Sequence, residues 1–175
     1  MVGASLAPEP FTFMSSIKDL DVGAGSEYFL KTPPGTTKIR LVSSPIRIWK
    51  DFDSKKLYLT EDGAKTNPEA KLRWACWAID RADGQTKLWE TSSGVIRDIV
   101  ALANNPEYTF EGDLMPYDLL INRVGTTLND TRYSVSPARQ NVPLTEIETK
   151  TVEAQQALIL FLRESAEDRD MVPII

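Results

Sequence analysis

Apolar and polar residues alternate over residues 36–52, which predicts a β-strand with one apolar face. Residues 43–45, Ser-Ser-Pro, interrupt the alternation, and proline is tolerated at sheet edges and bulges. This segment is therefore expected to form one long, bent strand. A shorter strand is predicted over residues 55–61 and a loop over residues 61–70.

Residues 71–91 alternate in the same way and contain Asp83-Gly84, a pair typical of a two-residue hairpin turn. This turn would place Ile79 opposite Leu88. A shift of the pairing by one residue would exchange the two faces of the hairpin. In the predicted register, one face carries Ala75, Trp77, Ile79 and Leu88, and the other carries Trp74, Cys76, Ala78 and Trp89.

Two segments have the apolar spacing of amphipathic helices. The first covers residues 92–104, with a serine as N-cap and Asn-Asn-Pro at its end. The second follows a capping box formed by Thr145 and Glu148 and continues toward the C-terminus. Between the two helices, residues 117–138 predict a second hairpin with a longer connection.

The predicted order is a bent strand, a short strand, a hairpin, a helix, a second hairpin and a terminal helix. This is the order of a five-stranded barrel of the OB type, with a helix between strands 3 and 4 and a C-terminal helix added. We therefore expect a mainly β fold of this kind, and the alternative is a generic α+β sandwich. The expected organisation is a flexible arm over residues 1–27, an OB domain over 28–143, and a helix with an acidic and apolar tail over 144–175.

The composition argues against catalysis and against a bound metal. The chain has 175 residues and no histidine, which removes the commonest general base and the commonest zinc ligand. Its single cysteine, Cys76, lies within a predicted strand and is expected to fill the core. The sequence contains no Gly-rich phosphate loop. We expect no enzyme activity, no cofactor and no metal, and neither a secretory signal nor a membrane-spanning segment.

Charge is distributed unevenly along the chain. The net charge is −5, whereas nucleic-acid binders are usually basic. Basic residues nevertheless concentrate in residues 38–97, and acidic residues concentrate toward the C-terminus. Three of the four tryptophans lie in residues 71–90, interleaved with lysine and arginine. Flat rings beside cations are suited to stacking unpaired bases while holding phosphates.

Three segments together resemble the single-stranded-DNA-binding (helix-destabilising) proteins of tailed bacteriophages. They are EYFLKTPPGTTKIRLVSSPIRIW, RWACWAIDRADGQTKLWETSSGVIRDIVALANNPE and YDLLINRVGTTLNDTRYSVSP, in this order and spacing. The resemblance implies an OB-fold that coats single-stranded DNA, largely without sequence preference. It also implies a role in phage DNA replication, recombination and repair in the cytoplasm of the bacterial host.

The candidate nucleic-acid-binding residues come from three predicted strands and the hairpin between them. The resemblance implies contributions from Arg40, Trp49, Trp74, Trp77, Arg81, Lys87, Trp89, Arg132 and Tyr133. The clustering of charge around the tryptophans adds Lys38, Arg47 and Arg73, and Tyr58 on the short strand is a further aromatic candidate.

These candidates also have structural interpretations. Trp77 shares its predicted face with Ile79 and Leu88, which favours a place in the core. Trp74 and Trp89 are the better stacking candidates. The alternative for Arg81 is an ion pair with Asp80 that braces the turn.

The expected partner is single-stranded DNA. The C-terminal residues 168–175 combine acids with an apolar end, and the hypothesis is that Asp168, Asp170 and Ile175 compete with DNA or recruit replication or recombination proteins. A frayed helix end is the simpler interpretation of this segment. Self-association is a further hypothesis, and no membrane partner is expected. The alternative function is an OB-like protein-interaction or regulatory module of a phage replication or transcription complex.

Overall fold

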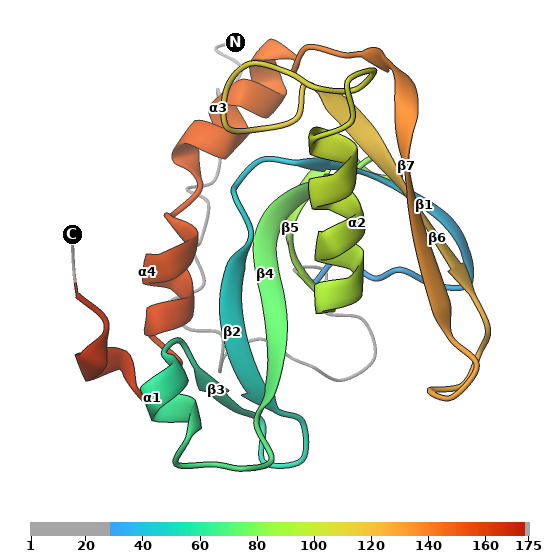
Figure 1. Cartoon of the computed structure of the whole chain (residues 1–175). Coiled ribbons are helices and arrows are strands. Elements are labelled where there is room, and N and C mark those ends of the chain that lie inside the picture. The colour runs from blue at the N-terminus through green and yellow to red at the C-terminus, as the bar shows by residue number, and fades with distance from the viewer. Residues whose placement is uncertain (1–28, 174–175) are drawn as a thin grey trace, which may run out of the picture.

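The computed structural model describes residues 29–173, except for the side chains of residues 139 and 140. It is mainly β, with one antiparallel sheet and a few short helices (Figure 1). The predicted arm over residues 1–27 and the terminal Ile175 lie outside the described residues. The strands are β1 (Gly35–Leu41), β2 (Ile46–Asp51), β3 (Lys56–Tyr58), β4 (Lys71–Asp80), β5 (Gln85–Thr91), β6 (Tyr117–Val124) and β7 (Arg132–Asn141), and the helices are α1 (Glu61–Ala64), α2 (Ser93–Ala103), α3 (Glu146–Ala154) and α4 (Leu158–Arg163), followed by a 3₁₀ turn at Arg169–Met171.

The sheet is open and has seven strands, so the prediction of a closed five-stranded barrel is not met. The strand order is β3-β2-β4-β1-β6-β7, and β5 pairs with β4. A closed barrel would require β5 to pair with β7. Instead, Phe29 forms a parallel bridge with Leu88 of β5, and the amide of Leu30 donates a 2.9 Å hydrogen bond to the carbonyl of Leu88. The N-terminal end of the described chain therefore occupies the edge of β5.

The predicted bend in the first strand is confirmed, because β1 and β2 both pair with the same strand, β4. The interruption at Ser43 is stabilised locally. Its hydroxyl accepts a 2.8 Å hydrogen bond from the amide of Trp77, and the amide of Val42 donates to the carbonyl of Trp77 over 3.0 Å. The bend lets β4 border both halves of the strand.

The β4–β5 hairpin exists as predicted, but its turn and register differ from the prediction. The turn spans four residues, 81–84, and Trp77 lies opposite Leu88 while Ile79 lies opposite Thr86. The carboxylate of Asp80 accepts the amide of Ala82, and that of Asp83 accepts the amide of Gln85, which stabilises the longer turn. Because the shift is two residues, every side chain keeps its predicted face.

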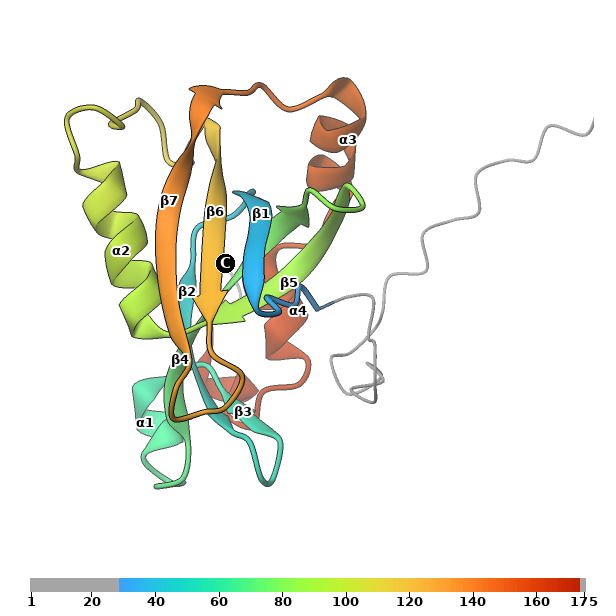
Figure 2. The ribbon, with the colours of Figure 1, turned by 90° about the vertical axis from the view of Figure 1, so that its right-hand side faces the viewer.

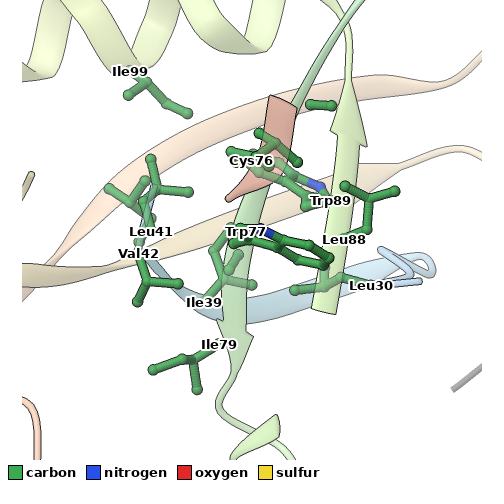
Figure 3. Close-up of a cluster of buried hydrophobic side chains, with 14 of the residues drawn as sticks. Leu30, Ile39, Leu41, Val42, Cys76, Trp77, Ile79, Leu88, Trp89 and Ile99 are labelled. Atoms are coloured by element: carbon green, nitrogen blue, oxygen red, sulfur yellow. The ribbon is translucent and has the colours of Figure 1, made fainter. Parts of the chain in front are cut away.

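Both faces of this hairpin are covered. Helix α2, whose N-cap is Ser92, one of the two serines expected there (Ser92 or Ser93), lies across one side of the curved sheet, and α4 lies against the other (Figures 1 and 2). Figure 3 shows Trp77 and Trp89 within the apolar cluster that β1, β4, β5 and α2 build. The ring of Trp77 lies 5.0 Å from that of Phe161 on α4, and its Nε1 donates to the carbonyl of Gln156 over 3.0 Å.

The predicted C-terminal helix is divided into α3 and α4. The capping box of Thr145 and Glu148 is present at the start of α3. Gln155 has an extended conformation and ends α3, and the bond between Trp77 and Gln156 lies at this break. The break turns α4 toward the sheet, where Leu158, Phe161 and Leu162 are buried.

The C-terminal segment is also held at its end. The loop predicted over residues 61–70 contains the short helix α1, and Asp168 lies beside its start. The Asp168 carboxylate accepts hydrogen bonds from the amide of Leu59 (2.9 Å) and from the amide and hydroxyl of Thr60 (2.7 and 2.5 Å). In residues 29–173, no helix has the length and apolar character that crossing a bilayer requires.

Candidate nucleic-acid interface

An exposed phenylalanine between two cations lies where β2 ends. The ring of Phe52 is 54% exposed. Lys50 Nζ lies 5.8 Å from its centroid, and Arg73 Cζ lies 5.9 Å from it. Lys50 also pairs with Glu90 over 3.0 Å, whereas the Nε atom of Arg73 is buried without a hydrogen-bond partner. The exposed part of this ring and the two neighbouring cations suit a nucleotide, which offers both a base and a phosphate.

A tryptophan occupies the other face of the same strand. Trp49 is half-buried, and Arg47 Cζ lies 5.9 Å from its ring. Trp74 lies on the neighbouring strand, since Arg47 pairs with Trp74 in the ladder. Trp74 is also half-buried, and its Nε1 donates to the hydroxyl of Ser93 over 3.1 Å. Both rings therefore keep part of their surface in contact with solvent.

A third ring and cation lie at the end of the β6–β7 hairpin. Tyr133 is 38% exposed, and Arg123 Cζ lies 6.0 Å from its ring. Arg123 donates to the carbonyl of Thr32 over 3.2 Å, and its Nε is buried without a partner. Arg132 is exposed beside this pair and donates to the carbonyls of Asn129 and Thr131.

These features share one end of the molecule, where the β2–β4 connection and the β6–β7 connection lie (Figure 2). Four of the cation–π contacts between described residues use Arg47, Lys50 or Arg73 of β2 and β4, and a fifth joins Arg123 of β6 to Tyr133 of β7. Seven described cations on β2, β3, β4, β6, β7 and the turn after β2 have no ion pair to a described carboxylate: Arg47, Lys55, Lys56, Lys71, Arg73, Arg123 and Arg132. Elsewhere in the described chain, Lys31, Arg97, Arg163 and Arg169 also lack such a pair. We call the first set, with Phe52, Trp49 and Tyr133, the ring–cation end.

The turn that leads from β2 to β3 is rigid and presents lysines. The Asp51 carboxylate accepts hydrogen bonds from Asn67 Nδ2 (2.9 Å), from the Ser54 hydroxyl (2.7 Å) and from two turn amides. These bonds, led by that from Asn67, lower the pKa of Asp51 to about 2. Lys55 has a φ of 58°, the only positive φ of a non-glycine residue among residues 29–173.

Four basic candidates take part in ion pairs at the opposite end of the sheet. The buried Arg40 donates to Asp118 Oδ1 over 2.9 Å and to the carbonyl of Val142. Arg81 pairs with both Asp118 and Glu148, which joins the β4–β5 turn to α3. Lys38 is exposed and lies 3.9 Å from Asp118. Burial opposes ionisation of Glu148, but its bonds to the Thr145 amide and to Arg81 outweigh burial and lower its pKa.

Lys87 is the fourth of these cations. It bonds Asp80 over 3.0 Å and Asp83 over 2.6 Å. Burial lowers the pKa of Lys87, but the two carboxylates outweigh burial and raise it; the bond to Lys87 lowers the pKa of Asp83. The interpretation that Asp80 pairs with Arg81 is therefore wrong, because Asp80 holds Lys87 instead.

Several aromatic candidates are buried. Trp89 is only 2% exposed, which corrects the expectation that it offers a ring to a base. Tyr58 is buried as well, and Trp77 lies in the core as predicted. For Trp77 and Trp89 the cause is the helix cover on both sides of the β4–β5 hairpin. Cys76 on β4 is buried, and burial raises the pKa of its thiol to about 12, so it fills space in the core as a neutral group.

One carboxylate of the acidic tail stabilises the fold. Asp168 is buried and bonded to Thr60, so this carboxylate caps a loop. Asp170 is exposed. Competition with DNA or recruitment of partners by the tail stays a prediction.

The sequence analysis missed Lys50, Phe52, Lys55, Lys71 and Arg123. Phe52 was passed over because it lies at the boundary between a predicted strand and a turn. A signal was present, since Phe52 ends an alternating segment and is followed within four residues by Lys55 and Lys56. Phe52, Lys55 and Lys56 lie at and after the end of β2, and all three are exposed.

No protein-family model, curated protein or solved structure matches this chain. In the part of the chain that the structure describes, no three Cys, Asp or Glu side chains are grouped so as to hold a metal ion. The site is thus defined by its own geometry.

Proposed function

We propose that this protein binds single-stranded DNA without catalysis and largely without sequence preference, and protects it during phage DNA replication, recombination and repair in the host cytoplasm. The observation that carries the proposal is the exposed ring of Phe52, which has Lys50 and Arg73 within 6 Å of its centroid. Trp49 with Arg47 and Tyr133 with Arg123 repeat this combination of ring and cation.

The chemistry of the ring–cation end matches an unpaired strand. Stacking a base on an aromatic ring contributes roughly 1–3 kcal/mol and is tolerant of sequence, since every base has a flat face. Lysines and arginines without carboxylate partners are free to neutralise phosphates and release counterions. Two or three stacked bases with several phosphate contacts give useful affinity despite the net negative charge of the chain.

The order of the elements supports an OB-related fold for the same function. A bent strand (β1 and β2), a hairpin (β4 and β5), a helix (α2) and a second hairpin (β6 and β7) follow one another as in that fold. OB-folds bind oligonucleotides between the connection that follows strand 1 and the connection between strands 4 and 5. In this chain those connections are residues 52–70 and 125–131, which lie at the ring–cation end.

A fluorescence titration tests the proposal. The intrinsic tryptophan fluorescence of the protein is followed while oligo(dT) is added at 50 and 200 mM salt, and we expect quenching and weaker binding at the higher salt. Phe52→Ala should weaken binding about tenfold, which corresponds to about 1.4 kcal/mol and lies within the range for one stacked base. Ile147→Ala is the matched control, because Ile147 is exposed on α3. Absence of binding by the wild-type protein at 50 mM salt would reject the proposal.

A further inference from the structure

A leucine stands free at the tip of the β6–β7 connection. Leu128 is 99% exposed, more than any other large apolar residue among residues 29–173. Val124, at the end of β6, is 60% exposed below it. A single exposed leucine is ordinary on a protein surface. Leu128 differs because the loop that presents it is held in one shape.

The loop is stabilised from inside by Asp130. Its Oδ1 accepts hydrogen bonds from the amide of Thr126 (3.1 Å) and from the amide and hydroxyl of Thr127 (both 2.7 Å). These bonds, with that from the Thr127 hydroxyl first, lower the pKa of Asp130. The amide of Thr131 donates to the carbonyl of Thr127 over 3.1 Å. The loop starts at Gly125, where φ is 95° and a Cβ would overlap the carbonyl of Asp130.

The surroundings of Leu128 are basic and aromatic. Arg132 and Arg123 flank the loop, and neither pairs with a described carboxylate. The carboxylate of Asp130 is directed into the loop by the bonds just described. The ring of Tyr133 lies 6.0 Å from Arg123 Cζ where the loop joins the two strands. Both guanidinium groups donate to backbone carbonyls, but no described carboxylate neutralises their charge. An apolar tip near two such charges favours a nucleic acid over an apolar protein surface, which offers no phosphates for the arginines.

We propose that this tip recognises the junction between single-stranded and double-stranded DNA, with Leu128 packed on the last base pair of the duplex. This inference rests on the proposed single-strand binding and adds a second element to its ligand. The terminal base pair exposes a wide, flat and apolar face that a continuous single strand lacks. Leucine is among the side chains that proteins place against base steps. A loop that is already ordered loses little conformational freedom when it binds.

The position of the tip fits the path that the single strand would take. Figure 2 shows the β6–β7 connection at the same lower end as the turn between β2 and β3, and Figure 1 shows it to the right of that turn. Arg123 and Arg132 lie at the ends of β6 and β7 that flank the loop, where the phosphates of the junction would follow. The single strand leaving the duplex then continues toward the remaining rings and cations of this end.

The experiment compares two DNAs that carry the same dT tail. One is the tail alone, and the other is the tail attached to a stable hairpin duplex, so that only the second contains a junction. We expect the wild-type protein to bind the junction DNA about fivefold more tightly than the tail. This difference in affinity corresponds to the burial of part of the Leu128 side chain against the base pair. Leu128→Ala should bring this ratio close to one and leave binding of the tail alone unchanged. Leu128→Phe, which keeps an apolar tip, should preserve the preference.

Two controls separate this inference from the proposed function. Ile147→Ala removes an exposed apolar side chain from α3 and should keep the wild-type ratio. A blunt hairpin without a tail should bind weakly, because it lacks unpaired bases. A wild-type ratio near one, or an unchanged ratio in Leu128→Ala, would overturn junction recognition while tail binding still supports the proposed function. Failure of the wild-type protein to bind the tail would overturn both.

Discussion

The Nε atom of Arg40 donates a 2.9 Å hydrogen bond to Oδ1 of Asp118, and neither side chain is more than 4% exposed. This ion pair joins β1 to β6 at the end of the sheet opposite the ring–cation end. It shows that cations close together in the sequence have different roles. Arg40 neutralises a buried carboxylate, whereas Arg47, seven positions later, lies over a ring and has no described carboxylate partner.

Replacing Asp118 by asparagine should destabilise the protein strongly. The change keeps the shape but leaves the buried Arg40 guanidinium without its counterion, and breaking such a pair typically costs about 3–5 kcal/mol. The free energy of unfolding, measured by urea titration, should fall by that order. Asp62→Asn is the matched control, because the Asp62–Lys65 pair is exposed and should contribute well under about 1 kcal/mol. Equal stability of Asp118→Asn and the wild type would contradict the structural role of the pair.

Replacing Gly63 by alanine should release the C-terminal segment from β3. A Cβ at this position would overlap the carboxylate of Asp168, which then cannot keep its bonds to Leu59 and Thr60. Loss of these bonds should cost about 2–4 kcal/mol. Hydrogen exchange should show faster exchange of residues 164–173. The control is Gly94→Ala in α2, where a Cβ meets only the Ser92 hydroxyl at 3.8 Å and alanine should be neutral or stabilising. Unchanged exchange in Gly63→Ala would show that Asp168 does not hold the segment.

Replacing Lys55 by glycine should make the protein more stable and a weaker binder. A left-handed backbone conformation costs a lysine about 1–2 kcal/mol, and glycine avoids this cost. Glycine also has more conformational entropy in the unfolded chain, which offsets part of the gain, so the free energy of unfolding should rise by about 0.5–1 kcal/mol. If Lys55 contacts a phosphate, the slope of log K against log salt should become shallower by about 0.7. The exposed Lys150 on α3 supplies the control, and Lys150→Gln should leave the slope unchanged. A stabilised variant with an unaltered slope would exclude Lys55 from the interface.

The stabilising effect of Asp51 should depend on pH. Its pKa in the folded protein, about 2, lies below the ordinary value of 3.8, so its charged form stabilises the fold above about pH 4. That contribution is lost as the pH falls from 4 toward 2. In thermal unfolding followed by circular dichroism, the advantage of the wild type over Asp51→Asn should be constant from pH 7 to 5 and shrink between pH 4 and 2. An advantage that stays constant down to pH 2 would exclude this source of stability.

The strand and helix pattern was accessible from the sequence because it depends on local periodicity. The bent strand, both hairpins and the N-cap at Ser92 follow from spacing and from the conformational preferences of proline and serine. The register of the β4–β5 hairpin was not accessible. Asp80 and Asp83 each accept a turn amide, and these bonds favour a four-residue turn over the two-residue turn that Asp-Gly suggests.

The sequence predicted the residue types of the candidate site, aromatic rings beside cations, but not which of these residues are exposed. Alternation assigns side chains to a face but does not tell which faces are covered, and here α2 and α4 cover both faces of the hairpin that carries Trp77 and Trp89. The partners of Arg40 and Arg81 lie at Asp118 and Glu148, far along the chain, so their ion pairs depend on the tertiary fold. The helices cover the middle of the sheet and bury the rings there, whereas Phe52, at the end of a strand, stays exposed.

The pairing of β1 with β6 has a consequence for synthesis of the chain on the ribosome. Gly35 pairs with Arg123, so one edge of β1 has no partner until the chain has grown by about 88 residues (123 − 35). At about 5–20 residues per second, the delay is roughly 4–18 s. During this time the nascent chain exposes a strand edge and an apolar sheet face, both of which promote aggregation. The ribosome and its chaperones would therefore have to shield the incomplete sheet. The yield of folded protein in a foreign host should then depend on the rate of translation.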